Sequence, residues 1–279
     1  MANSAYASGI NLDAMMVPTK AATVFAAQEA SLYLSGAIVP MVNTPAGSAS
    51  AQVPVMGSVS ATVISSEATP GADLETVLPS DTKKTIALDL HAARSVVRDL
   101  GGVSTDEIGR ILGNAIAASA DKTLTGHFAD LTAQEITSGN LDLDEIFAAV
   151  ATIRGAGETG QLYGIVSTDA YADLMTAIGN AAYAGGDFQT EALRNGFVGN
   201  IAGVQCFVSS YVNNTNIAGS LNPKMAIFSA DAMRGAMQGG VNLEVERRAS
   251  AVGFDVVASV AAGFDVIDAT RGVLIQDAA

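Results

Sequence analysis

Two segments of alternating apolar and polar residues, separated by a long polar stretch, constrain the fold of this chain most. From Val53 to Val63 the valines share one face of a predicted strand, and the alternation recurs from Ile86 through Leu88 to Leu90. The stretch at 65–82 between them is rich in Pro, Gly and acidic residues, so the pair is predicted to form a long hairpin. Two strands alone are marginal in water, and so long a connection is uncommon in a compact domain. The apolar face must be covered by the chain's own core or by a neighbouring subunit, and we favour the neighbour.

The composition excludes several classes of protein. The chain has 279 residues, of which 49% are hydrophobic and 15% are charged, so it can form one large or two modest domains and is not of the disordered type. Its 28 acidic residues exceed its 14 Lys and Arg, and the net charge of −14 disfavours binding to nucleic acid or to anionic membranes. Cys206 is the only cysteine, so an internal disulfide is excluded, and two distant histidines with one thiol cannot readily supply a zinc site. The N-terminus has no pattern of a secretory signal, so we expect synthesis in a reducing cytoplasm.

A long helix is the strongest element that the sequence predicts. Ser104 and Glu107 have the spacing of a capping box. Apolar residues then recur at helical spacing: Ile108, Ile111, Leu112, Ala115, Ile116, Leu124, Phe128 and Leu131. A helix from Ser104 to Asp130 would be roughly 40 Å long, which few small globular domains need.

Shorter elements are predicted on both sides of this helix. Residues 1 to about 18 are predicted to form a polar arm, and a short helix follows Pro18 and ends near Gly36. A helix capped by Asp142 runs to Gly155, and it is expected to bury Ile146, Phe147, Val150 and Ile153. Another helix is predicted at 168–179, and strands are predicted at 162–166, 197–201, 204–209, 225–229 and 241–246, with a turn at 200–203. The phrases GFDVV at 253–257 and GFDVI at 263–267 indicate strand composition rather than a tandem repeat.

Few motifs in the sequence are typical of catalytic or ligand-binding sites. Residues 155–160 match the G-x-G-x-x-G pattern of dinucleotide sites, but a helix precedes them and a strand follows, which reverses the order that phosphate binding requires. We therefore interpret them as a helix-to-strand turn. The P-loop and G-x-S-x-G motifs are absent, and Ser167 follows a strand without the flanking glycines of a nucleophile elbow.

His91 and His127 are the only candidates for a neutral-pH base or a metal-binding imidazole. Each is predicted near the end of an element, where a surface or capping role is commoner than catalysis. Cys206 falls within a predicted strand, as a small buried hydrophobe would. We therefore expect no catalytic role for these residues.

Charged residues cluster at two element ends. Asp142, Asp144 and Glu145 lie at a predicted helix start, where carboxylates complement the helix dipole. Arg247 and Arg248 form the only adjacent arginine pair. We interpret that pair as a solvated strand end, with pairing to acidic residues of another subunit as the alternative.

In order and proportion, the predicted elements resemble those of the major capsid proteins of tailed bacteriophages, which have the Hong Kong 97 (Johnson) fold. This α+β fold has an N-terminal arm, an extended β-hairpin loop, a long spine helix, a peripheral domain and an axial domain. The phrase GFVGNIAGVQCFVSSYV at 196–212 is similar to the strand, glycine turn, strand and serine passage of the family's axial domain. The stretch at 251–275 resembles its long peripheral strand, which returns beneath the spine helix, followed by a short axial strand.

The resemblance covers essentially the whole chain and implies its division into parts. The implied parts are an N-terminal arm at 1–40, an extended hairpin loop at 41–101, a peripheral domain with the spine helix at 102–160, completed by about 250–268, and an axial domain at 161–249, completed by about 269–279. Some family members cross-link a loop lysine to a neighbouring subunit, but Lys83 and Lys84 are predicted on the return strand of the loop, so cross-linking is not expected.

The resemblance implies a non-enzymatic major capsid protein that self-assembles as hexamers and pentamers into the icosahedral head of a tailed double-stranded DNA phage. It implies a portal and a separate scaffold protein as partners, enclosed DNA that is not bound specifically, and no membrane. We expect no cofactor, no metal, and no catalytic or cofactor-binding residues. Assembly would take place in the host cytoplasm, and the protein would reside in the virion.

Two alternatives stay open. An encapsulin-like nanocompartment shell resembles the same fold but encloses cargo enzymes. A small α/β enzyme that uses His91 or His127 belongs to a different class, and it would remain a small oligomer in solution.

Overall fold

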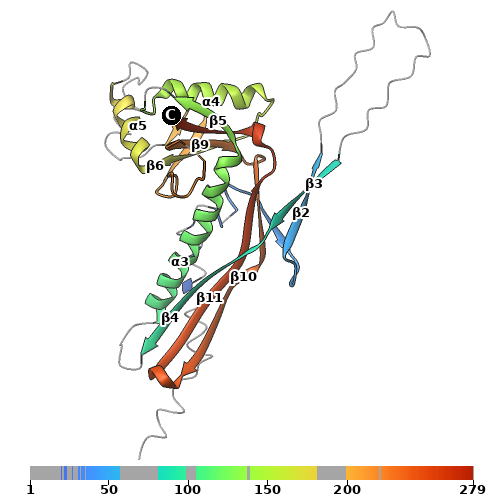
Figure 1. The fold of residues 1–279 in the computed structure, drawn as a ribbon, viewed down its shortest axis with the longest axis vertical. Helices are drawn as coiled ribbons and strands as arrows, with labels where there is room; N and C mark the ends of the chain where they lie inside the picture. Colours follow the sequence, from blue (N-terminus) through green and yellow to red (C-terminus); the bar gives the residue numbers. More distant parts are fainter. Residues whose placement is uncertain are drawn as a thin grey trace, which may run out of the picture.

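The computed structural model describes residues 20, 22–23, 27, 31, 33–34, 36–56, 81–98, 105–136, 139–180, 199–219 and 221–278. Within them, a long narrow sheet lies along one helix, a second sheet with two helices lies at one end, and a two-stranded hairpin projects from the body (Figure 1). The molecule is therefore elongated, with a compact part at the end that holds the C-terminus.

The first sheet is built from four strands, of which only β10 and β11 follow one another directly in the chain. Its order is β1 (Met41–Thr44), β10 (Met233–Arg248), β11 (Gly253–Val266) and β4 (Asp89–Arg98). The turn η2 (Ala249–Ala251) joins β10 to β11, and β1 pairs parallel with β10 while the other pairs are antiparallel. Both GFDV phrases lie in β11, so the prediction of strand composition is confirmed.

The helix α3 (Thr105–Gly126) covers one face of this sheet. Its buried side chains form one core with alternate residues of β11: Ile108, Leu112, Ile116 and Leu124 with Val256, Ala258, Val260 and Ala262. The predicted long helix is confirmed, but from His127 to Asp130 it continues as the 3-10 helix η1. Ile111 and Ala115 share the helical spacing of the predicted apolar residues, but both are exposed, because the buried face of the helix is centred on Leu112 and Ile116.

The second sheet has six strands. Its order is β5 (Thr132–Ile136), β12 (Gly272–Asp277), β9 (Pro223–Ser229), β6 (Leu162–Ser167), β8 (Val204–Ser209) and β7 (Asn200–Ile201). Every residue of β9 is buried, as expected for a strand covered on both faces. The predicted strands at 162–166, 204–209 and 225–229 are confirmed, and the strand predicted at 241–246 lies in the second half of the longer β10. The predicted turn is confirmed as well, with positive φ at Ala202 and Gly203.

The helices α4 (Leu143–Gly155) and α5 (Thr168–Asn180) share the core of this sheet. Both were predicted, but Phe147 is 41% exposed and not buried as expected. Asp142 occupies the N-cap position of α4, yet its side chain makes no capping hydrogen bond, so that part of the prediction is wrong. The turn η3 (Ala269–Arg271) carries the chain from β11 of the first sheet to β12 of the second.

The projecting hairpin consists of β2 (Ser50–Met56) and β3 (Asp81–Ala87), which pair antiparallel as predicted. Most of its predicted tip, the arm at 1–18 and the capping box at Ser104 lie outside the described residues. In the short helix predicted after Pro18, the described residues Lys20, Ala22, Thr23 and Ala27 are helical.

Candidate assembly surfaces

The base of the hairpin packs on the body of the same chain. Ile86 of β3 and Ala51 of β2 are buried, and they form a small core with Ala236 of β10. At its base, the apolar face is therefore covered by the chain's own core and not by the neighbour that we favoured. Farther along β2, Val53 and Val55 are only half-buried, which leaves apolar surface for another subunit to cover.

Close backbone contact fixes where the hairpin leaves the body. A Cβ on Gly263 of β11 would lie 1.8 Å from the carbonyl oxygen of Ala87, so only glycine lets the two segments cross there. Beside this crossing, Lys84 Nζ donates a hydrogen bond to the carbonyl of Val266 at 2.9 Å. Lys83 and Lys84 both lie on the return strand β3, as predicted, and Lys84 anchors the hairpin.

Strand β4 is the edge of the long sheet, and its outer side is partly apolar. Leu90 is 71% exposed and Val96 is 41% exposed. Leu90 was expected to share the buried face of Ile86, which is wrong, because the alternation shifts between Leu88 and His91 so that His91 points inward. An edge strand with exposed apolar side chains is a candidate docking surface.

Charged residues lie at the far end of the same sheet. Arg94 of β4 forms a bidentate pair with Asp255 of β11, with Nε 2.7 Å from Oδ1, and these hydrogen bonds hold the pKa of Asp255 below its ordinary value. Arg248 lies 3.9 Å from Asp255, and the guanidinium of Arg247 lies 4.7 Å from the centre of the Phe254 ring. Both adjacent arginines are exposed, which agrees with the interpretation as a solvated strand end.

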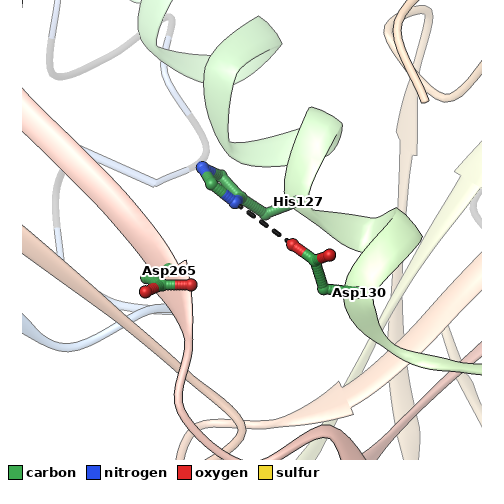
Figure 2. A group of neighbouring side chains, drawn as sticks. All are labelled: His127, Asp130 and Asp265. Atoms are coloured by element: carbon green, nitrogen blue, oxygen red, sulfur yellow. Dashed lines mark ion pairs between the residues drawn. The ribbon is translucent and has the colours of Figure 1, made fainter. Parts of the chain in front are cut away.

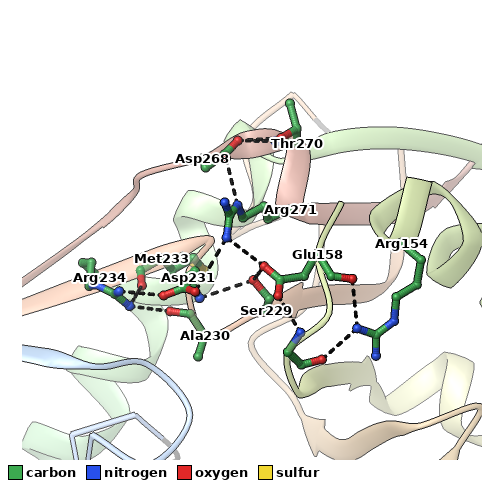
Figure 3. Close-up of polar contacts among 11 residues, drawn as sticks. Arg154, Glu158, Ser229, Ala230, Asp231, Met233, Arg234, Asp268, Thr270 and Arg271 are labelled. Atoms are coloured by element: carbon green, nitrogen blue, oxygen red, sulfur yellow. Dashed lines mark hydrogen bonds and ion pairs between the residues drawn. The ribbon is translucent and has the colours of Figure 1, made fainter. Parts of the chain in front are cut away.

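A buried carboxylate links the six-stranded sheet to the turn η3, which connects the two sheets (Figure 3). Glu158, which follows α4, accepts hydrogen bonds from the Gly160 N–H at 2.7 Å, from Ser229 Oγ at 3.1 Å and from Arg271 Nη1 at 2.9 Å. Arg271 also pairs with Asp268 at 3.1 Å. Burial alone would raise the pKa of Glu158, but these hydrogen bonds and the charge of Arg271 bring it below its ordinary value. Glu158 therefore remains ionised inside the junction between β6, β9 and η3.

The turn that holds this carboxylate is the one predicted at 155–160. Arg154 Nη1 donates hydrogen bonds to the carbonyls of Glu158 at 3.0 Å and Gly160 at 2.9 Å, and β6 follows directly. The helix-to-strand turn is confirmed. The burial of Glu158 was not predicted from the sequence. The only indication in the sequence was an acidic residue between Gly157 and Gly160.

His91 is buried beneath α3, where it contacts Ser119, and does not have the surface or capping role that was expected. Its Nδ1 lies 2.8 Å from Ser119 Oγ, and its Nε2 has no hydrogen-bond partner among the described residues. Burial lowers the pKa of His91, against smaller opposing effects of the Ala262 carbonyl and of Asp89. Within the described parts of the chain, no carboxylate forms a hydrogen bond to His91 such as the one that orients a catalytic histidine. A surface hollow lined by Leu90 lies on the face of β4 opposite to His91, because successive residues of a strand face opposite ways.

The remaining candidate residues serve local structure. Ser167 Oγ accepts a hydrogen bond from the Ala170 N–H at 3.1 Å at the start of α5. Cys206 is buried in β8, as predicted, and burial raises the pKa of its thiol to about 12. Asp144 and Glu145 lie in the first turn of α4, as predicted.

His127 begins η1 and lies beside Asp130. It is about two helical turns beyond Ser119, the residue of α3 that His91 contacts. The structure therefore does not bring the two histidines into one site. No helix within the described parts of the chain is long and apolar enough to cross a membrane.

No protein-family model and no curated protein sequence matches this chain. Solved structures do match. The capsid of the cyanophage P-SCSP1u has a TM-score of 0.66 and 18% identity, and the match covers 86% of this chain and 86% of that chain. The chain has the Hong Kong 97 fold.

Two further structures share this Hong Kong 97 fold. A chain of Mycobacterium phage Che8 matches with a TM-score of 0.63 and 20% identity over 82% of this chain and 84% of that chain. The virus-like particle from Pyrococcus furiosus matches with a TM-score of 0.63 and 12% identity over 92% of this chain and 97% of that chain. The α+β fold class is thus confirmed.

Proposed function

We propose that this chain is a major capsid protein that self-assembles into the icosahedral head of a tailed double-stranded DNA bacteriophage. The observation that carries the proposal is the likeness to the capsid of the cyanophage P-SCSP1u over 86% of each chain. The projecting hairpin supports it, because beyond the base that packs on the chain's own core, Val53 and Val55 stay only half-buried unless another subunit covers them. Much of the stability of the hairpin would then appear on assembly.

The parts of the chain take the following roles in this proposal. Residues 1–40 form the arm, 41–101 the extended loop, 102–160 with about 250–268 the peripheral domain, and 161–249 with about 269–279 the axial domain. The position of α3 along the long sheet and the separate six-stranded sheet support this division. The passage from β11 to β12 would link the peripheral and axial domains.

The proposed role is structural and requires no catalytic residue and no cofactor. Copies of this chain would form hexamers and pentamers in the host cytoplasm, with a portal and a separate scaffold protein as partners. The net charge of −14 suits a virion wall that encloses DNA without binding it specifically.

An encapsulin-like nanocompartment is the second candidate function. The likeness to the virus-like particle from Pyrococcus furiosus, which covers 97% of that chain, raises this candidate, and it does not outweigh the likeness to the phage capsid. The contents of particles from the native source separate the two candidates. Nuclease-protected DNA supports the phage head, whereas a co-purified enzyme in DNA-free particles supports the nanocompartment.

Negative-stain electron microscopy of the recombinant chain, after size-exclusion chromatography at several salt concentrations, tests shell formation. We expect closed shells, or sheets and tubes of hexameric tiles. A small monodisperse oligomer under every condition, even with a candidate scaffold protein added, would contradict both shell functions. It would favour the alternative of a small enzyme that uses His91 or His127.

A further inference from the structure

Three metal-ligating side chains converge where the end of α3 meets β11 (Figure 2). His127 begins η1, Asp130 ends it, and Asp265 is the next-to-last residue of β11. One ligand atom of each residue lies within 4.8 Å of the other two, and His127 Nδ1 is 3.5 Å from Asp130 Oδ2. Elements far apart in the sequence thus direct one imidazole and two carboxylates into the same space.

The charges around this cluster favour a cation. Among the described residues, neither Asp130 nor Asp265 forms an ion pair with a lysine or an arginine. Arg234 lies opposite Asp265 in the pairing of β10 with β11, but its guanidinium pairs with Asp231 instead. Two carboxylates that face each other without a cation repel one another, and the net charge of −14 adds to the attraction for a positive ion.

The donor atoms and their spacing suit Zn²⁺. This ion accepts imidazole nitrogen and carboxylate oxygen at about 2.0–2.2 Å, which places the ligand atoms of a tetrahedral site about 3.4 Å apart. The separation of 3.5 Å between His127 and Asp130 is already close to this value. Side-chain rotation of Asp265, which is only half-buried, would bring in the third ligand. The fourth position is left to water.

We propose that His127, Asp130 and Asp265 bind one Zn²⁺ per chain and thereby tie the end of the spine helix to the long strand. In the bound state the neutral imidazole coordinates the ion, so the contact of His127 with Asp130 is replaced by shared coordination. From the sequence, only histidine and thiol ligands were considered for zinc, because only the fold brings these two carboxylates beside His127. All three ligands belong to one chain, so the inference does not depend on shell formation.

Isothermal titration of Zn²⁺ into the metal-stripped full-length protein tests the site. We expect one ion per chain, with affinity at least about tenfold weaker in His127→Ala and in Asp265→Asn. Asp169→Asn is the matched control, because it changes an exposed aspartate at the start of α5 and should leave the affinity unchanged. With Co²⁺ in place of Zn²⁺, the visible absorption of the bound ion should disappear in the same two variants.

Several results would overturn this proposal. One is the absence of saturable Zn²⁺ binding by the wild-type protein, and another is unchanged affinity in both ligand variants. Equally tight binding of Ca²⁺ or Mg²⁺ would identify a general acidic surface, because an imidazole ligand favours Zn²⁺ over these hard cations. Circular dichroism checks that each variant folds, and Asp130→Asn, whose side chain is 63% exposed, replaces any variant that does not.

Discussion

Two isoleucines on the same helix face opposite environments, which allows a matched test at the scale of single residues. Ile116 is 1% exposed and Ile111 is 58% exposed. Ile116→Asp should abolish soluble expression, because an unpaired charge in the core costs about 3–5 kcal/mol. Ile111→Asp should change the free energy of unfolding by only about 0.5 kcal/mol. Soluble yield and urea unfolding measure the difference, and equal behaviour of the two variants would mean that the buried face of α3 is assigned wrongly.

Glu158 predicts a pH dependence of stability. Its pKa is lowered in the folded protein, so its contribution is present above the ordinary pKa of a glutamate and is lost as the pH falls through the lowered value. Glu158→Gln should reduce the free energy of unfolding by about 2 kcal/mol at neutral pH, since hydrogen bonds to a charged group are lost. The difference from the wild type should shrink in acid.

The control for this substitution is Glu135→Gln, which changes an exposed carboxylate of β5. Urea unfolding across a pH series should show little effect of this second variant. A difference between wild type and Glu158→Gln that stays constant into acid would argue against an ionised Glu158 in the junction.

Sequence reasoning failed at single residues where the fold changes the local pattern. Leu90 follows the alternation of Ile86 in the sequence, and only the shift between Leu88 and His91 turns it outward. Besides the nearby Gly160 N–H, the side-chain partners of Glu158 are Ser229 on β9 and Arg271 on η3, so the sequence around Glu158 did not indicate a buried ion pair. The same holds for Asp265 beside His127.

At the scale of elements, the crossing of β11 by the hairpin predicts a sharp difference between two strand glycines. Gly263→Ala should reduce the free energy of unfolding by about 3 kcal/mol, because the added Cβ would overlap the carbonyl of Ala87. Gly240→Ala in β10 meets nothing within 4 Å and should be nearly neutral. Urea unfolding of the two variants measures this, and equal stability would contradict the close approach.

The tip of the hairpin gives a second prediction at this scale. Deleting residues 65–80 keeps β2 and β3, whose base is anchored to the body. The protomer should therefore stay folded by circular dichroism, while electron microscopy should show few or no shells. Normal particles from this deletion would contradict a role of the loop between subunits.

Elements with strong local patterns were predictable, and those that depend on distant partners were not. The helix α3 and the strand β8 follow from the periodicity of their own residues. The strand β5 has the polar sequence TAQEI and exists because it pairs in parallel with β12. The break of the helix at Gly126, before η1, likewise has no marker in the apolar spacing.

At the scale of the whole molecule, the net charge of −14 predicts weak interaction with DNA. The purified protein should not retard double-stranded DNA in a gel at low salt, because it lacks the cationic surface that releases counterions from phosphate. A basic protein of similar size is the positive control. Retardation that disappears as salt is added would reveal a cationic face and contradict the proposed wall that does not bind DNA.

The positions of the last two strands have a consequence for the order of events during synthesis. β11 lies between β10 and β4, and β12 lies between β5 and β9, so each fills the interior of a sheet. During synthesis, neither sheet can be completed before its inner strand within residues 253–277 has left the ribosome. Such non-local pairing slows folding. A chain that is still being synthesised therefore lacks the completed sheets through which it would contact other copies. Translation would thereby act as a timer that keeps incomplete chains out of a growing assembly.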